Sequence, residues 1–258
     1  MFQVVRLESD VADRVTFLAR HLASNRLVCV RLWRRTETSF DDVAIEASLL
    51  QYLSTTKVTP QFYGVFVVSD DSAYSKYGIV SEFIGHPVSL EVASVASLLS
   101  SNNSAPSLNW IQLCADLVAA VNAINEKGVV INNGLNTDSI LLKQVDGRWS
   151  VCLCDQSWSC YRDYTFDRKR LHRKRASSEN TVAPEVVDTA HCSAASDMYL
   201  VGCVISHIAT LTNSRVLEGI AGKCLCRDVN ERSRGGVLLQ LLETALDASR
   251  DMQIPSLC

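Results

Sequence analysis

The chain has 258 residues, enough for one large domain or two small ones with a substantial hydrophobic core. Apolar residues make up 47% of the chain and charged residues 21%, a composition that excludes a disordered, collagen-like or coiled-coil protein. The 25 basic and 28 acidic side chains give a net charge of −3, so nucleic-acid binding is not expected as the main function.

Two segments bear on membranes and secretion. Six charged side chains interrupt the first twenty residues, so we expect no secretory signal there. Residues 198–214 form a run of 17 without Asp, Glu, Lys or Arg. A membrane span needs about 20 mostly apolar residues, and this run is shorter and carries several polar side chains. We therefore expect a buried core helix and no membrane partner.

Ten cysteines are present, and half of them lie inside apolar segments, where a free thiol behaves as a small hydrophobic group. Two pairs, Cys152/Cys154 and Cys224/Cys226, have C-x-C spacing. Zinc is the alternative interpretation, but zinc knuckles favour C-x-x-C. We expect reduced thiols, no metal site, and an intracellular protein in the cytoplasm, the nucleus or both.

In chain order, the first third is β-rich and carries one helix. Short runs typical of strands occur at 14–19, 27–33, 62–68 and 77–84. Between them Ser39 signals a helix start, and the following helix places Glu46, Leu50 and Leu53 on one face.

From about residue 88 the pattern becomes helical. Apolar residues recur every three or four positions from Trp110 to Ile124, in a helix that begins near Pro106-Ser107 and closes at Gly128. Two short strand-like runs follow, then a polar basic stretch at 158–182, then further helices over 197–210 and 237–246. We expect one α+β domain over 1–258, with a β-rich part at 1–84 and a larger helical part at 85–258.

Seven features, in chain order, resemble the sequence motifs of the protein kinase superfamily. They are LVCVRLWRR (27–35), Glu46, GVVINNGLNTDSILL (128–142), VCLCDQSWS (151–159), VAPEVV (182–187), ASDMYLVGCVI (195–205) and CLCRDVNERS (224–233). The resemblance implies a bilobal kinase fold, with a small β-rich N-lobe bearing one αC-type helix and a mainly helical C-lobe.

In that resemblance the nucleotide pocket survives only in part. Arg31 stands at the strand lysine and could pair with Glu46 at the αC glutamate, while Asp155 keeps the metal-binding carboxylate. If Val15 ends the glycine-rich loop, its three glycine positions hold acids, and the first glycine of the chain is Gly64. The three acids are Glu8, Asp10 and Asp13.

The catalytic motifs are degraded at every remaining position. Gly134 stands at the catalytic aspartate, or Asn133 does if the alignment shifts by one residue, and neither is a carboxylate. Ser139 replaces the metal-binding Asn, and Gln156 replaces the Phe of Asp-Phe-Gly. Gln156 and Asn132 would both enter an apolar stack, where each needs hydrogen bonds.

The scaffold residues of the family are retained. The resemblance pairs Glu185 with Arg232 and makes Asp197 the anchor of the catalytic-loop backbone. We expect Arg232→Ala to destabilise the protein strongly and Gly134→Asp to leave its stability nearly unchanged. Fewer residues than usual follow the central helix, so we also expect the family's next loop and helix to be shortened there.

Residues 168–175 carry six of the 25 basic side chains and no acid, inside the segment that corresponds to the activation loop. Three interpretations stay open. The run is a solvated loop, a binding or nuclear-import site, or a basic context for phosphorylation of the candidate phosphosites Ser177 and Ser178.

Lost chemistry on a retained scaffold indicates a pseudokinase: a signalling module that acts by binding protein partners, as a scaffold or regulator, with no cofactor. The alternative is an atypical, weak serine/threonine-type kinase that binds Mg-ATP through Arg31 and Asp155. A third interpretation is some other kinase-fold domain or an unrelated binding domain.

Overall fold

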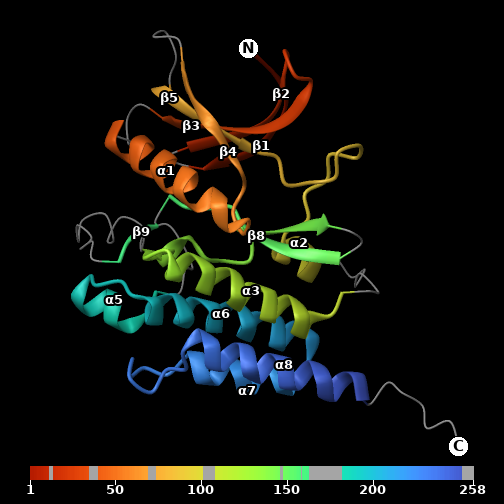
Figure 1. Cartoon of the computed structure of the whole chain (residues 1–258), viewed down its shortest axis with the longest axis vertical. Coiled ribbons are helices and arrows are strands. Elements are labelled where there is room, and N and C mark those ends of the chain that lie inside the picture. Colours follow the sequence, from red (N-terminus) through yellow and green to blue (C-terminus); the bar gives the residue numbers. More distant parts are fainter. Residues whose placement is uncertain are drawn as a thin grey trace, which may run out of the picture. The chain divides into compact units, whose positions relative to one another are not determined.

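The structure is a computed structural model that describes residues 1–11, 14–34, 40–68, 74–100, 108–145, 148–157, 159–162 and 182–251. The chain folds into two compact units, Met1–Val92 and Ala93–Cys258 (Figure 1). The sequence placed the division after residue 84. The segment that follows stays with the first unit, where the Arg6 guanidinium donates a hydrogen bond to the Leu90 carbonyl.

The first unit is a five-stranded antiparallel sheet with one helix. The strands have the order β1-β2-β3-β5-β4. Their bounds are β1 Phe2–Val11, β2 Arg14–His21, β3 Arg26–Arg34, β4 Phe62–Val67 and β5 Tyr74–Glu82. Helix α1 (Phe40–Leu53) continues into the short η1 (Ser54–Thr56) and packs on β4 and β5. The core between helix and sheet contains Trp33, Val43, Ala47, Leu50 and Ile79.

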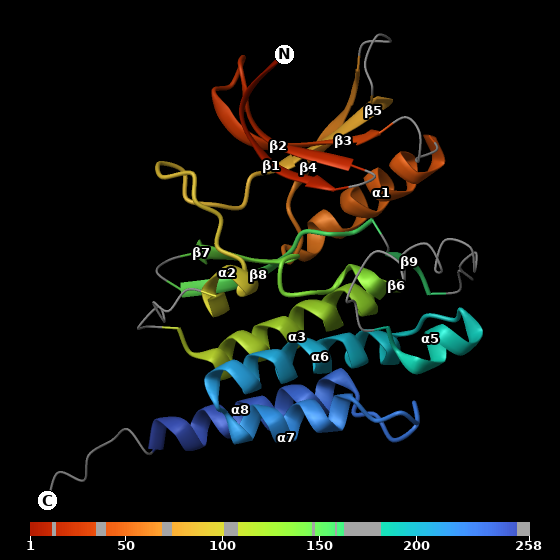
Figure 2. The ribbon, with the colours of Figure 1, turned by 180° about the vertical axis from the view of Figure 1, so that it is seen from behind.

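The second unit is mainly helical. Its helices are α2 Val95–Ser100, α3 Trp110–Glu126, α5 Pro184–Thr189, α6 Ala194–Thr212, α7 Arg215–Cys224 and α8 Gly235–Asp251. Its short strands are β6 Val129–Val130, β7 Ile140–Val145, β8 Arg148–Leu153 and β9 Cys160–Tyr161, with the turn η2 Asn132–Gly134 after β6. β7 pairs with β8, and β6 pairs with β9. Helix α3 packs on α6 and α8, and α6 packs on α7 (Figures 1 and 2).

Local sequence signals fix the ends of α3. The Asn109 side chain accepts hydrogen bonds from the backbone N–H groups of Ile111 and Gln112, which would otherwise lack partners. At the other end Gly128 has a φ of 76°, a left-handed conformation that favours glycine after a helix. The predicted closure at Gly128 is therefore confirmed, whereas Pro106-Ser107 lie outside the described residues.

Helix α6 contains residues 198–212 of the apolar run, as the predicted core helix requires. Among the described residues it is the one helix long and apolar enough to cross a membrane. More than half of that apolar stretch is buried, and the helix packs against α3 and α7. Ser193 caps its first turn and Asn213 ends it in a left-handed conformation.

Helix α7 occupies the stretch after the central helix, where sequence patterns predicted no particular helix. The Ser214 side chain accepts a hydrogen bond from Leu217 N and starts a ten-residue helix at once. Its Leu217, Ile220 and Cys224 are buried, at the spacing of one helical face. This stretch therefore contributes to the core.

Candidate functional site

Arg31 and Glu46 meet in the first unit. Arg31 lies on β3 and Glu46 on α1, and the Arg31 guanidinium forms an ion pair with the Glu46 carboxylate. The Glu46 side chain is only 3% exposed, so this carboxylate depends on the pairing. The arrangement holds the helix to the sheet.

The β1–β2 hairpin occupies the place of the glycine-rich loop, since Val15 is the second residue of β2. Both described acids at glycine positions are held by neighbouring arginines. Glu8 pairs with Arg6 at 2.6 Å, and Asp10 pairs with Arg34. The third acid, Asp13, lies outside the described residues.

Asp197, on α6, organises the segment that leads into the catalytic loop. Its carboxylate accepts hydrogen bonds from Ile131 N at 2.9 Å, Asn132 N at 2.8 Å and the Asn125 side-chain amide at 2.7 Å. Burial raises the pKa of Asp197 to about 7, although these three donors act to lower it. Sequence reasoning missed Asn125, whose only signal is a polar residue on the apolar face of α3.

Gly134 is the centre of the degraded loop. The Ser139 hydroxyl donates a hydrogen bond to the Gly134 carbonyl at 2.7 Å and accepts one from Asn136 N at 3.0 Å. A Cβ atom added at Gly134 would lie 2.6 Å from the carbonyl oxygen of Asp155. No side chain fits without movement of the backbone, so the expectation that Gly134→Asp leaves stability unchanged is wrong.

Side chains of the Asp155-Gln156-Ser157 segment form hydrogen bonds within the segment and with the residues next to it. The Asp155 carboxylate accepts from the Ser157 backbone N–H at 3.1 Å and from its hydroxyl at 2.6 Å. Gln156 is fully buried; its amide donates to the Leu153 carbonyl at 3.1 Å and accepts from the Ser159 hydroxyl at 2.7 Å.

Asn132 behaves differently from Gln156. Within the described part of the chain, its buried side-chain nitrogen has no hydrogen-bond partner. Its backbone has a φ of 56°, a left-handed conformation that Asn tolerates better than most residues. Of the two polar residues expected in an apolar stack, only Gln156 has both ends of its amide satisfied.

Glu185 and Arg232 are joined by two hydrogen bonds across 47 residues of sequence. The Arg232 guanidinium donates to the two Glu185 oxygens at 2.7 and 3.0 Å. It also donates to the carbonyls of Ala195 and Cys226 and lies over the Tyr199 ring, 5.0 Å from its centroid. The Arg232 side chain is 1% exposed, so nearly all its donors depend on these partners.

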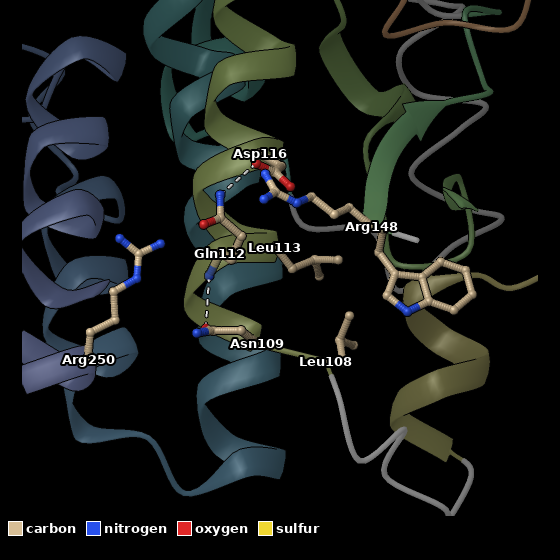
Figure 3. A pocket seen from close by; sticks show the side chains of 8 residues that line it. Leu108, Asn109, Gln112, Leu113, Asp116, Arg148 and Arg250 are labelled. Atoms are coloured by element: carbon tan, nitrogen blue, oxygen red, sulfur yellow. Dashed lines mark hydrogen bonds between the residues drawn. The ribbon is translucent and has the colours of Figure 1, made fainter. Parts of the chain in front are cut away.

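A separate pocket of about 490 Å³ opens where the first half of α3 faces the start of β8 and the end of α8 (Figure 3). Arg148 points toward Asp116, which accepts a hydrogen bond from Gln112 at 2.9 Å. Burial raises the pKa of Asp116. The lining residues include none of the kinase-motif positions.

Several predicted features lie outside the described residues, namely the basic run 168–175 and both candidate phosphosites, Ser177 and Ser178. Across the ranges that the structure does describe, no group of three or more His, Cys, Asp or Glu side chains is placed to hold a metal ion.

A β-sheet unit with a paired strand arginine and helix glutamate, followed by a helical unit with an anchored loop, defines the protein kinase fold. In agreement, the family model for the protein tyrosine and serine/threonine kinase matches residues 15–237. The chain therefore belongs to the protein kinase superfamily. None of the curated proteins matches it.

Proposed function

We propose that this chain is a pseudokinase, a catalytically inactive kinase domain that acts by binding other proteins as a scaffold or regulatory module. The packing at Gly134 carries the proposal. In one alignment this residue replaces the catalytic base, and the Asp155 carbonyl leaves no room for a side chain there. In the other alignment the position holds Asn133, which cannot accept the substrate proton as a carboxylate would.

Mg-ATP is the ligand that the family implies, and the residues here do not fit it. Phosphate binding needs backbone N–H groups at close approach, but Glu8 and Asp10 place carboxylates at two of the glycine positions. Of the family's two metal-binding positions, only Asp155 keeps the family's residue. The Ser139 hydroxyl that replaces the other is already engaged with Gly134 and Asn136.

The retained interactions support a binding role. Asp197, Glu185 and Arg232 make the contacts that hold the loop and helices of the second unit in place. The buried charges that stabilise the fold are kept, whereas positions 134 and 139 hold Gly and Ser. Such a chain can offer a folded binding surface without phosphotransfer chemistry.

A nucleotide titration tests the loss of catalysis. The melting temperature of the purified chain is measured with ATP, ADP and GTP, with and without Mg²⁺, because a ligand that binds the folded state raises it. We expect no Mg²⁺-dependent rise and no transfer of radiolabelled phosphate. Phosphate transfer at an ordinary kinase rate, about 1–100 per second, would contradict the proposal.

A weak kinase is the second candidate, favoured by the Arg31–Glu46 ion pair and by the retained Asp155. It predicts slow autophosphorylation that disappears in Asp155→Ala. Arg215→Ala is the matched control, because it changes a charged residue at the start of α7, away from the motif positions.

The binding role is tested by affinity capture from cells with the wild type, Asp155→Ala and Arg232→Ala. We expect the same partners on the wild type and on Asp155→Ala, since binding does not need a nucleotide metal. Partners should be lost from Arg232→Ala, in which the fold is weakened. Partners that depend on Asp155 would instead favour the weak kinase.

A further inference from the structure

The two C-x-C pairs of this chain share a spacing but not a geometry. Cys152 lies on β8 and Cys154 directly follows that strand. Cys224 is the last residue of α7, and Cys226 lies just beyond it. Both pairs are reduced thiols in this structure.

Cys152 and Cys154 face each other. Their Sγ atoms are 3.9 Å apart, and the Cys154 thiol also lies 3.7 Å from the Cys152 carbonyl oxygen. Side chains two residues apart on a strand project to the same side, and their Cα atoms are about 6.4–6.8 Å apart. A disulfide needs Cβ atoms about 3.5–4.5 Å apart, closer than an extended strand holds them, so bridging this pair requires the strand end to bend.

Cys224 and Cys226 do not face each other. The Cys224 thiol is directed at the Ile220 carbonyl at 3.5 Å, and the Cys226 thiol at the Gly222 carbonyl at 3.6 Å. This second pair is therefore an internal control with the same sequence motif.

We propose that Cys152 and Cys154 form a redox-active dithiol, which hydrogen peroxide converts into a disulfide within the chain. Cys154 is half-buried, whereas Cys152 is 3% exposed, so the peroxide reaches Cys154 first.

The reaction balances in two steps. The Cys154 thiolate attacks one peroxide oxygen: the S–O bond forms, the O–O bond breaks and one water leaves, giving a sulfenic acid. The Cys152 sulfur then attacks the Cys154 sulfur; the S–S bond forms, the S–O bond breaks and a second water leaves. Two thiols are oxidised and one peroxide is reduced to two waters. A thiol reductant reverses the change.

The disulfide would act on the degraded catalytic loop. The Cys154 backbone N–H donates to the Ser139 carbonyl at 3.0 Å, and the next residue, Asp155, places its carbonyl against Gly134. Bringing the two sulfurs from 3.9 Å to about 2.05 Å shifts the backbone of this strand end, which carries both contacts. A disulfide that displaces its backbone is strained, and strained disulfides are the readily reduced, regulatory kind.

Peptide mapping of the reduced full-length chain tests the proposal. After a pulse of hydrogen peroxide, free thiols are alkylated and the protein is cut with trypsin and Asp-N. These enzymes release Trp149–Cys154 and Cys224–Arg227 as separate peptides, each with one C-x-C pair. We expect the first peptide to be unalkylated, lighter by two hydrogen atoms and restored by dithiothreitol. It should form on the order of tenfold faster than any cross-link in the second.

Two variants sharpen the test. Cys152→Ser should leave Cys154 as a sulfenic acid that dimedone traps, and the control Cys226→Ser should leave the first peptide's oxidation unchanged. The proposal is overturned if Cys154 is oxidised to sulfinic acid without a cross-link, if Cys154 pairs with Cys160, or if both peptides cross-link at equal rates. If a variant fails to fold, the peptide map of the wild-type chain by itself still tests the proposal.

Discussion

Two polar clusters of the second unit differ in how far they keep the residues that the kinase family has there. The structural cluster, Asp197 with Glu185–Arg232, keeps its charges and satisfies them with short hydrogen bonds. In the loop around Gly134 and Ser139, small neutral residues stand where the family has an aspartate and an asparagine. The difference follows from burial. Removing a buried charge strands its partners, whereas replacing a reactive side chain removes chemistry at little cost to the fold.

The largest effect is expected from Arg232→Ala. The change strands Glu185 and two carbonyls at a site where the arginine is 1% exposed. Breaking a buried pair costs about 3–5 kcal/mol, which lowers the melting temperature by about 6–20 °C in a domain of this size. Calorimetry should show this loss, and the exposed neighbour Arg234 supplies the control as Arg234→Ala. Equal melting of the two variants would show that the pair does not brace the fold.

Asp197→Asn should have the next largest effect, a loss of about 1–3 kcal/mol in stability. The N–H₂ group of the new side chain would face one of the three N–H donors that now bind the carboxylate. The folded-state pKa of Asp197 is raised, to about 7, above its ordinary value of 3.8. The contribution of this raised pKa to the free energy of unfolding is therefore full below pH 3.8 and is lost as the pH rises through about 7. In urea unfolding, the difference in free energy of unfolding between the wild type and Asp197→Asn should become smaller from pH 5 to pH 8. A constant or widening gap would contradict it.

Gly134→Ala should destabilise the chain by about 1–3 kcal/mol, because the added Cβ meets a backbone oxygen. Gly219→Ala is the matched control on α7, where an added Cβ meets nothing within 4 Å. Replacing glycine inside a helix should instead stabilise the protein by about 0.5–1 kcal/mol. Thermal melts of the two variants should therefore move in opposite directions, and a neutral Gly134→Ala would show that the loop has room after all.

Ser139→Ala should have the smallest effect, about 1 kcal/mol, since it removes one hydrogen bond to Gly134 O and one from Asn136 N. Ser139→Asn, which restores the family's metal ligand, should produce no Mg²⁺-dependent rise in melting temperature in the presence of ATP. A clear rise would mean that this single position had blocked nucleotide binding.

Sequence patterns predicted the elements whose apolar faces are regular, such as α3 and β2 to β5. Strand β1 escaped notice because Val4, Val5 and Leu7 are all exposed, so no alternation marks a buried face. Helix α7 was not predicted because it begins directly after its cap residue, Ser214, and no loop separates it from the preceding helix.

The site was predictable by residue type but not by contact. Motif order located Glu185 and Arg232 because charged residues at fixed places are visible in a sequence. No pattern could show that the Gln156 amide finds the Leu153 carbonyl and the Ser159 hydroxyl. Nor could it show that Gly134 touches Asp155, because such contacts depend on how two separate backbone segments approach.

That contact has a consequence for any attempt to place the family's aspartate at position 134. With the Asp155 carbonyl 2.6 Å from where a Cβ would sit, an aspartate at 134 arrives in a space that is already filled. An aspartate at position 134 therefore requires the backbone of residue 155 to move first. If the chain is inactive as proposed, a laboratory selection for phosphotransfer should yield its first changes in the segment Asp155–Ser157, and changes at Gly134 only on that altered background.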